Sequence, residues 1–376
     1  MAAHGKWVGI DAGADEVAIC ILSGTGEIVR EMRADASASA VRAKLPKPRD
    51  GLVIGIEAGA TAIHLTRGLR AAGYNVRVLE TRRVHGFLGL RQNKSDRNDA
   101  RGIADVIRLS RAAGPDVLVK SERCQKLRSE LVLRHRLMQQ RMATEAAMRG
   151  ILRVNGGKIS RAWSGAHLEK SVVTEIERLR GEGVDLSEVL LPTLTSAVMV
   201  RRTLEVITRR LARIARADEV CSRLMTVPGV GCISALSFYT AIEEPERFIC
   251  NEDVGPYLGL APKLTQSGQA CHMGRISKRG NRMTRSHLVS AAKVLMQQSR
   301  LECDLRRWAL SIRERSGPAK ARVALARKLA VVMLAIWKSG GQFKPNKGIA
   351  PDPPPMITPA AAESFPHLKA AIDRAP

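Results

Sequence analysis

Hydrophobic and polar residues follow a strand-like pattern along the first eighty residues of the chain. Apolar runs bounded by turn residues predict five strands, at residues 6–11, 16–22, 27–33, 51–57 and 75–79. A Ser-Gly-Thr-Gly turn at residues 23–26 joins the second and third runs, so the first three strands form a meander. Helical stretches at residues 36–44 and 61–72 separate the later strands. This order predicts an α/β domain with a mixed sheet.

The pattern becomes helical from about residue 117 and remains so to about residue 153, where a pair of glycines follows. Farther along, apolar residues recur at alternating spacings of four and three, which is the heptad pattern of a helix-helix seam: Val200, Leu204, Ile207, Leu211 and Ile214. Such a seam packs either within the chain or against a second copy, and the pattern leaves both open. We expect a helical, coiled-coil connector over residues 115–220.

The second half of the chain predicts a mainly α-helical domain, with a final helix at about residues 319–337. Several prolines then follow within a short stretch, which favours a disordered tail. We therefore expect four parts: an α/β domain at 1–114, the connector at 115–220, a helical domain at 221–341 and the tail at 342–376.

The charge of the chain indicates a polyanionic partner. Lys and Arg number 61 against 36 Asp and Glu, which gives a net charge of +25 over 376 residues. A membrane-surface protein would concentrate these cations on one amphipathic helix, whereas here they are spread along the chain. Nucleic acid is the better match. Aromatic residues are only 3% of the chain, so phosphate contacts rather than base stacking should supply most of the affinity.

The cysteines and the apolar runs indicate the cellular compartment of the protein. The seven cysteines are scattered without a CxxC pair, which favours reduced thiols in a cytoplasm and no zinc site. The neighbours Cys271 and His272 alone do not make a metal site. The N-terminus lacks the apolar stretch of a secretory signal, and no apolar run is long enough to span a bilayer. We expect a cytoplasmic protein with no membrane partner.

Four acidic residues are candidates for one catalytic site. Asp96 and Asp99 are three residues apart, which places both carboxylates on one face of a helix. That spacing is also common in solvated helix starts. Asp11 and Glu57, however, each end an apolar strand, and neighbouring central strands would bring them together. The alternative is that Asp11 caps a turn and Glu57 pairs with an arginine. Four clustered carboxylates require cations, so we interpret the set as a divalent metal site for phosphodiester chemistry.

Two stretches in the second half are candidates for phosphate binding. The turn Pro228-Gly229-Val230-Gly231 matches a helix-hairpin-helix, in which Gly229 and Gly231 allow backbone amides to approach a phosphate. A plain helix-turn-helix packing unit is the alternative. Downstream lie a Ser267-Gly268 turn and four cations within eight residues, Arg275, Lys278, Arg279 and Arg282. Most such clusters are solvated surface, but this one follows a turn that would expose a hydroxyl.

Taken together, these motifs resemble the DEDD-type transposases of bacterial insertion sequences, the bridge-RNA-guided serine recombinase family. The resemblance covers about residues 5–340. It rests on the joint presence and order of the stretches around Asp11, around Glu57 and from Lys94 to Ala100, the hairpin at 228–231, and the run from Leu258 to Gly280.

The resemblance implies a RuvC-like N-terminal domain of RNase H fold, in which Asp11, Glu57, Asp96 and Asp99 bind Mg²⁺. It also implies a C-terminal domain that supplies a serine nucleophile. By position in the motif this serine is Ser267, with Ser277 the weaker candidate. In this family a phosphoserine-DNA intermediate forms, the two halves of the site come from different subunits of a tetramer, and a noncoding RNA selects the target. We therefore expect DNA and guide RNA as partners, a homodimer or homotetramer, and association with the bacterial nucleoid.

Two other functions are compatible with the same residues. A RuvC-like endonuclease would hydrolyse branched DNA with water and no covalent step. A non-catalytic protein would bind nucleic acid through the hairpin and the basic loop alone. Substitution of Ser267 separates the first alternative from the recombinase, and substitution of Asp11 separates the second.

Overall fold

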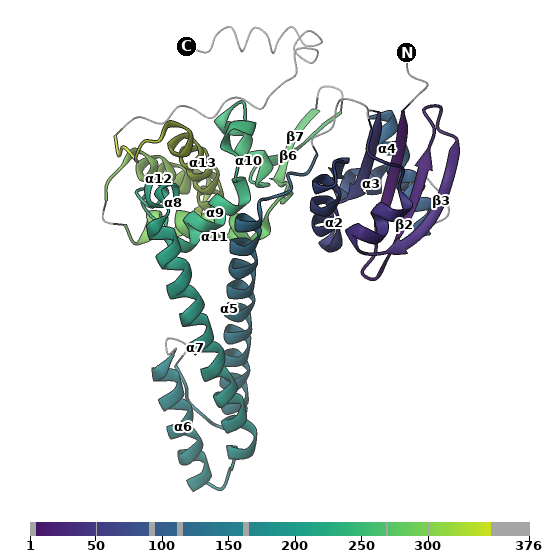
Figure 1. Cartoon of the computed structure of the whole chain (residues 1–376). Helices are drawn as coiled ribbons and strands as arrows, with labels where there is room; N and C mark the ends of the chain where they lie inside the picture. Colours follow the sequence, from purple (N-terminus) through teal and green to yellow (C-terminus); the bar gives the residue numbers. More distant parts are fainter. Residues whose placement is uncertain are drawn as a thin grey trace. The chain divides into compact units, whose positions relative to one another are not determined.

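The computed structural model of the chain describes residues 5–49, 51–89, 95–110, 116–160, 165–267, 270–299 and 301–346. The chain divides into two compact units, Met1–Ser121 and Glu122–Pro376, and Figure 1 labels many of their elements. In these described ranges no helix has the length and apolarity needed to cross a membrane. The domain boundaries after residues 114, 220 and 341 stay predictions, and from residue 347 onward the predicted tail lies outside the described residues.

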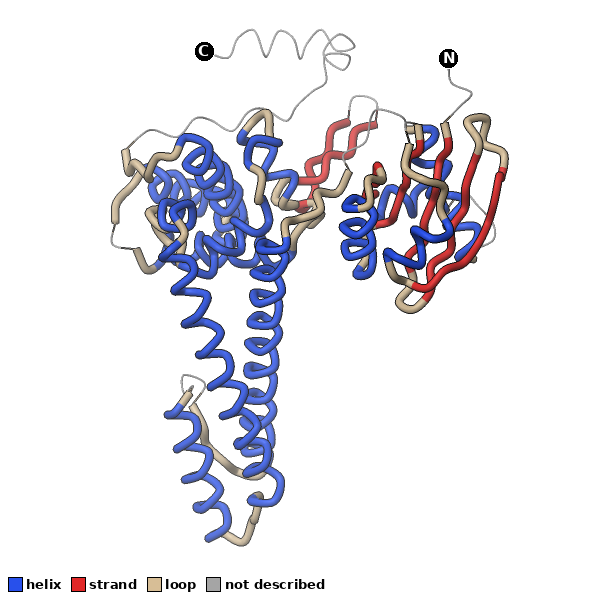
Figure 2. The backbone as a smooth tube through the Cα atoms, viewed as in Figure 1, coloured by secondary structure: helices blue, strands red, loops and turns tan. Residues whose placement is uncertain are grey.

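The first unit is built on a five-stranded mixed sheet in the order β3-β2-β1-β4-β5, drawn in red in Figure 2. The strands are β1 (Lys6–Ala12), β2 (Glu16–Leu22), β3 (Ile28–Asp35), β4 (Leu52–Glu57) and β5 (Asn75–Leu79). β1, β2 and β3 form the antiparallel meander, and β4 and β5 continue the sheet in parallel from β1. The α/β prediction and the expected RNase H-like arrangement are confirmed.

Helices cover both faces of this sheet because each central strand is buried on both sides. On one face, Ile10 and Ile56 share a core with residues of α1 (Ala38–Lys44) and α2 (Ala60–Ala71). On the other face, Cys20 packs with α4 (Asp96–Leu109), and α3 (Thr81–Leu88) packs beside α4. The sheet is thus the middle layer of three.

α4 lies unusually close to the sheet because two glycines leave room for it. A Cβ atom on Gly9 of β1 would lie 2.0 Å from the carbonyl oxygen of Ala100 and 2.5 Å from the backbone nitrogen of Ala104. A Cβ atom on Gly55 of β4, which is opposite Gly9 in the sheet, would lie 2.8 Å from a methyl group of Ile107. The backbone of α4 therefore rests directly on β1, and its isoleucine side chains fill the space above Gly55 of β4.

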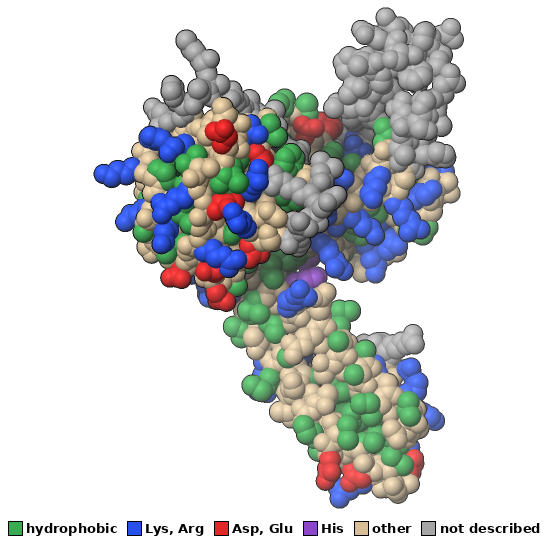
Figure 3. All heavy atoms as spheres, turned by 90° about the vertical axis from the view of Figure 1, so that its right-hand side faces the viewer, with side chains coloured by type: hydrophobic (Ala, Val, Ile, Leu, Met, Phe, Trp, Pro, Cys, Tyr) green, Lys and Arg blue, Asp and Glu red, His purple; other side chains and the backbone are tan. Residues whose placement is uncertain are grey.

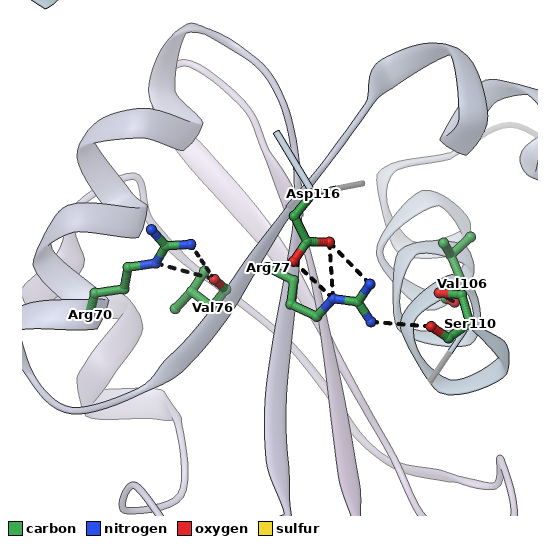
Figure 4. A network of polar contacts seen from close by, with 6 residues as sticks. All are labelled: Arg70, Val76, Arg77, Val106, Ser110 and Asp116. Carbon is green, nitrogen blue, oxygen red and sulfur yellow. Dashed lines mark hydrogen bonds and ion pairs between the residues drawn. The ribbon is translucent and has the colours of Figure 1, made fainter. Parts of the chain in front are cut away.

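An arginine on β5 ties the edge of the sheet to the segments that follow it (Figure 4). The guanidinium of Arg77 binds the carboxylate of Asp116, with nitrogen-oxygen distances of 3.0–3.2 Å, and also donates to the carbonyl of Ser110 just after α4. The Val117 amide donates to the Val78 carbonyl at 2.7 Å. Arg70 of α2 caps the same edge by donating to the carbonyl of Val76. These contacts hold the end of the first unit against β5.

The second unit begins with a helical stalk made of α5 (Glu122–Val154), α6 (Ala166–Gly181) and α7 (Ser187–Ala217). α5 and α7 run side by side in Figures 1 and 2. Leu211 of the predicted heptad seam shares a core with Leu127 and Leu131 of α5, and Leu204 is also buried. The alternative of packing within the chain is therefore confirmed, and α6 adds a separate small core at the far end of the stalk.

The rest of the second unit is a mainly helical head around α13 (Pro318–Ser339), which confirms the predicted final helix. Trp337 of α13 stacks on Tyr239 with 5.1 Å between ring centroids. The other elements of the head are α8 (Glu219–Leu224), α9 (Cys232–Ile242), η1 (Pro245–Arg247), η2 (Asn251–Asp253), α10 (Val254–Tyr257), β6 (Pro262–Ser267), β7 (Ala270–Ile276), α11 (Arg282–Gln297) and α12 (Asp304–Ser316).

We predict that Gly9→Ala destabilises the first unit. The new methyl group would collide with backbone atoms of α4, so the helix must move away from β1. Overpacking of this kind costs on the order of 1–3 kcal/mol. Chemical denaturation of the whole chain, followed by circular dichroism, should show a lower midpoint.

Gly150 in α5 provides a matched control, because nothing lies within 4 Å of a Cβ atom placed there. Gly150→Ala should leave the midpoint unchanged or raise it, since alanine is favoured over glycine inside a helix by roughly 1 kcal/mol. Equal midpoints for Gly9→Ala and the parent chain would contradict the proposed role of the glycine in helix packing.

We also predict that His287 makes stability depend on pH. Burial, together with the neighbouring Arg134 and His135 of α5, lowers the pKa of His287 to about 4. In the unfolded chain a histidine titrates near 6.5, so below that pH the unfolded state binds a proton that the folded state refuses. Stability should therefore fall as the pH decreases from about 6.5 toward 4. Between pH 7 and pH 5 the loss should be about 2 kcal/mol.

Urea unfolding at the two pH values measures this loss. The variant His287→Gln should lose most of the difference between them, because glutamine does not titrate. If that variant keeps the parental pH dependence, His287 is not its source.

Candidate catalytic and nucleic-acid sites

Asp11 and Glu57 lie side by side at the carboxyl ends of two neighbouring parallel strands. Ile10 of β1 is opposite Ile56 of β4 in the register, and each acid is the next residue along its strand. Both acids are partly exposed. The predicted juxtaposition of the two strand ends is thus present in the sheet.

The same two acids point toward the face of the sheet that α4 covers. Side chains alternate between faces along a strand, so Asp11 shares a face with Gly9, and Glu57 shares a face with Gly55. Both glycines lie against α4. The two carboxylates therefore emerge on the side of α4, just beyond the strip of sheet on which the helix rests.

The direction of α4 brings its first turn to the same end of the sheet. Arg108, near the end of α4, lies against Gly26 in the turn that follows β2, whereas Ala100 lies against Gly9 in the middle of β1. Because β2 ends beside the start of β1, α4 runs antiparallel to β1 and begins at the carboxyl end of that strand. Asp96 and Asp99 occupy this first turn.

Local interactions fix the start of α4. The Ser95 hydroxyl caps the helix by accepting from the Asn98 amide, and the Asp99 amide donates to the Ser95 carbonyl at 2.8 Å. Acidic residues are favourable here because the positive end of the helix dipole offsets part of their mutual repulsion. Asp99, next to the buried Ala100, is partly exposed, and Asp96 is exposed.

Cations of β3 and α4 surround this end of the sheet. The Arg33 guanidinium lies 3.9 Å from the Asp96 carboxylate and 2.8 Å from that of Glu16. Arg33 and Asp11 both pair with Ala18 of β2, so they share one row across the sheet. Arg97 bonds with Glu31 of β3, and this hydrogen bond raises the pKa of Arg97. Asp96 therefore has one weak, exposed ion pair, which it makes with Arg33 of β3.

The four acids are gathered at one end of one sheet face without forming a closed ligand group. Across the described ranges, no three His, Cys, Asp or Glu side chains are close enough together to hold a metal ion. The donor set nevertheless suits a hard divalent cation, since carboxylate oxygens are the ligands that such ions prefer. Residues 90–94, which precede this helix, lie outside the described residues.

The predicted hairpin is present between α8 and α9, but its two glycines differ in their surroundings. Gly229 has a φ of 86°, and a Cβ atom there would lie 2.4 Å from the carbonyl oxygen of Ala291, so its close neighbour is α11. Gly231 is the N-cap of α9 and has open space where a Cβ atom would lie. Gly231 therefore leaves the amides at the start of α9 accessible, whereas Gly229 packs the hairpin onto the head.

The predicted basic loop leads from β7 into α11. Lys278 and Gly280 both have positive φ angles, of 54° and 87°, which turn the backbone sharply. The Asn281 side chain then caps α11 by accepting from two backbone amides. The four predicted phosphate-binding cations are all exposed: Arg275, Lys278, Arg279 and Arg282.

Arg285 is a positioning residue that sequence reasoning missed. Its guanidinium donates to the Leu258 carbonyl at 2.9 Å and to the Arg279 carbonyl at 3.3 Å, which braces the basic loop against the segment after α10. Gly259 and Gly280 allow the two segments this close approach. Gly9 and Gly55 were missed as well. Their signal in the sequence is a glycine two positions before each strand-end acid.

The two candidate nucleophiles have different settings. Ser267 is the last residue of β6 and pairs with Ala270 across the β6-β7 hairpin, whereas its side chain and residues 268–269 lie outside the description. Ser277 follows β7, and its amide donates to the Ala261 carbonyl at 2.8 Å. The Ser277 hydroxyl accepts from the Arg279 amide, so it helps to shape the basic loop.

Comparison with known proteins matches both units to transposases. Residues 8–154 match the DEDD transposase family of IS110 elements, and residues 221–305 match the transposase IS116/IS110/IS902 family. The four candidate acids fall in the first match. The hairpin, the basic loop and both candidate serines fall in the second.

Curated relatives agree over most of their length. The transposase for insertion sequence element IS1111A of Coxiella burnetii is 28% identical over 335 residues, which are 88% of this chain and 89% of that protein. A probable family 20 transposase of Pseudomonas aeruginosa is 28% identical over 298 residues, which are 78% of this chain and 86% of the relative. The transposase for IS1328 of Yersinia enterocolitica is 26% identical, over 77% of this chain and 85% of its own.

The two matched regions, one with the four acids and one in the helical head, both belong to transposases. A DEDD domain implies a divalent metal, which the oxygen donors of Asp11, Glu57, Asp96 and Asp99 suit. A transposase is a DNA strand-transfer enzyme, and such an enzyme binds DNA. The chain belongs to the IS110/IS1111 family of insertion-sequence transposases.

Proposed function

We propose that this transposase cuts and rejoins the DNA of its insertion sequence through a phosphoserine intermediate, at a carboxylate site that uses Mg²⁺, and that a noncoding bridge RNA guides it. The observation that carries the proposal is the convergence of Asp11, Glu57 and the first turn of α4 on one end of one sheet face. Four carboxylates at one place repel each other and do not stabilise the fold. A bound cation would remove this repulsion.

In this proposal secondary structure fixes three of the acids, and the fourth, Asp96, moves into the site. Asp11 and Glu57 are fixed by the pairing of β1 with β4. Asp99 is fixed by the capped start of α4, and Asp96 exchanges its contact with Arg33 for the shared site. When bound there, Mg²⁺ would supply charge that polarises the scissile phosphate.

Ser267 is the proposed nucleophile. Its hydroxyl oxygen forms a bond to phosphorus and gives up its proton, while the bond from phosphorus to the leaving sugar oxygen breaks and that oxygen gains a proton. Attack by a sugar hydroxyl of the exchanged strand then reverses the step and frees the serine. The number of phosphoester bonds is unchanged throughout, so no external energy source is required.

The basic loop is proposed to hold the DNA backbone next to that serine. Arg275, Lys278, Arg279 and Arg282 are exposed, and α11, which begins at Arg282, has no acidic residue in its first turn. Gly231 is proposed to expose the amides of α9 to a second phosphate, and Gly229 to keep the hairpin in place. The cations and the helix start both favour an anion.

Support for the guide RNA and for a homodimer or homotetramer comes from the resemblance to the bridge-RNA-guided family and from the net charge of +25. The named relatives are bacterial proteins. We therefore propose that the protein works on the bacterial nucleoid, in the cytoplasm.

We predict that Asp11→Asn and Asp99→Asn each reduce DNA strand cleavage at least about a hundredfold, because each removes a ligand charge from the site. DNA binding in a mobility-shift assay should persist. Asp15→Asn is the matched control, since Asp15 is an exposed acid in the turn after β1. It should cleave like the parent protein. Full cleavage by Asp11→Asn would refute the metal role of the tetrad.

We predict that Ser267→Ala abolishes the covalent protein-DNA adduct. End-labelled DNA that carries an element end should migrate with the parent protein on a denaturing gel, and should not do so with this variant. Ser277→Ala should retain the adduct, because that hydroxyl shapes the loop.

Two outcomes would overturn the serine mechanism. An adduct formed by Ser267→Ala would assign the nucleophile to another residue. Cleavage by Ser267→Ala at the parental rate would favour the RuvC-like endonuclease, in which water attacks the phosphate.

A further inference from the structure

A row of arginines lies on the face of α7 opposite its buried leucines, in a part of the sequence that contains neither the proposed acids nor the basic loop. Arg202, Arg209, Arg213 and Arg216 are all exposed, and their spacings of seven, four and three residues place them on one side of the helix. Leu204 and Leu211, which are buried, occupy the other side. We call these four residues the arginine stripe. At 1.5 Å per residue it is about 21 Å long.

Ion pairs among the described residues do not explain the stripe. Arg209 has one acidic neighbour, Glu205, at 3.5 Å, and Glu205 already binds Arg201 at 2.9 Å. Among the described residues, Arg202, Arg213 and Arg216 have no ion pair within 4.0 Å. Like charges three and four residues apart destabilise a helix by a few tenths of a kcal/mol per pair. The stripe thus has a cost that the fold does not offset.

Two other arginines of α7 differ from the stripe because they form close ion pairs that join helices of the stalk. Arg201 is partly buried and binds both Glu169 and Glu205. Arg210, on the side of α7 toward α5, pairs with Glu130 at 3.3 Å. Each of these cations has an acidic partner at close range. The residues of the stripe differ from Arg201 in exposure and, except for Arg209, from both Arg201 and Arg210 in pairing.

The chemistry of the stripe fits the backbone of duplex DNA. Duplex DNA carries one phosphate per 3.4 Å of axis on each strand, so about 21 Å presents roughly six phosphates to the four guanidinium groups. The sequence of α7 contains no aromatic residue on which an unpaired base could stack. Figure 3 shows one face of the molecule, over which Lys and Arg side chains are scattered, whereas the stripe is a straight row on one helix.

We propose that the arginine stripe is a docking surface for the phosphate backbone of duplex DNA that flanks the bond to be cut. This inference goes beyond the proposed function, because it concerns neither the carboxylates nor Ser267. The stripe lies on the half of α7 that joins the head. The stripe would contact phosphates and no bases. It would therefore raise the affinity for DNA of any sequence by the same amount.

The experiment compares two triple variants of the full chain that lose the same charge. The first is Arg209→Gln with Arg213→Gln and Arg216→Gln. The control is Arg313→Gln with Arg315→Gln and Lys320→Gln, which are exposed cations of α12 and α13 with no ion pair among the described residues. Binding of a DNA duplex is measured by fluorescence anisotropy over a series of salt concentrations.

For the stripe variant we expect the slope of log K against log salt to shrink by about 3, because three phosphate contacts are lost. Affinity near physiological salt should fall at least about tenfold. The control should keep the parental slope. A third variant with lysine at positions 209, 213 and 216 should restore most of the affinity, which separates lost charge from a misfolded stalk.

Three results would overturn the proposal. Equal loss in the stripe and control variants would mean that only net charge matters. Loss that the lysine variant does not restore would point to damage of the stalk. Weakened binding of an RNA duplex with unchanged binding of DNA would assign the stripe to RNA.

Discussion

The close packing of α4 on the two glycines of the central strands is the constraint on which the candidate active site depends. Gly9 and Gly55 let the helix lie directly on β1 and β4. The antiparallel direction of the helix then places its first turn at the carboxyl ends of those strands. Asp96 and Asp99 reach the neighbourhood of Asp11 and Glu57 only through this contact. The site is therefore a consequence of helix-sheet packing rather than of any local motif.

The sequence was sufficient to predict the layout of the first unit. Strand-like runs that end in Asp11 and Glu57 alternate with helical ones, and the mixed sheet follows from that order. The heptad spacing through Leu204 and Leu211 predicted a helix-helix seam, but not which helix would fill it. That choice depends on α5, which begins some eighty residues earlier. The β6-β7 hairpin was not predicted, because polar residues and glycines interrupt its apolar pattern.

The candidate site was harder to predict than the fold because its neighbours come from distant parts of the chain. Each of Asp11 and Glu57 directly follows an apolar run, so their place at neighbouring strand ends could be expected from the sequence. The contact between Arg33 and Asp96 depends on how β3 and α4 lie across the sheet, and no residue spacing in the sequence predicts it. The same holds for Arg285, whose partners are two carbonyl groups. Backbone acceptors leave no signature in the residue types.

Gly9 and Gly55, which both lie under α4, differ in whether a second substitution can make room for a larger residue. At Gly9 the atoms in the way of a Cβ are backbone atoms of Ala100 and Ala104, which every residue possesses. No second substitution on the helix can make room for a larger residue. At Gly55 the obstacles are methyl groups of Ile103 and Ile107, which smaller side chains would remove. A larger residue at position 55 can therefore be accommodated by smaller residues at positions 103 and 107. No substitution in α4 can accommodate a larger residue at position 9.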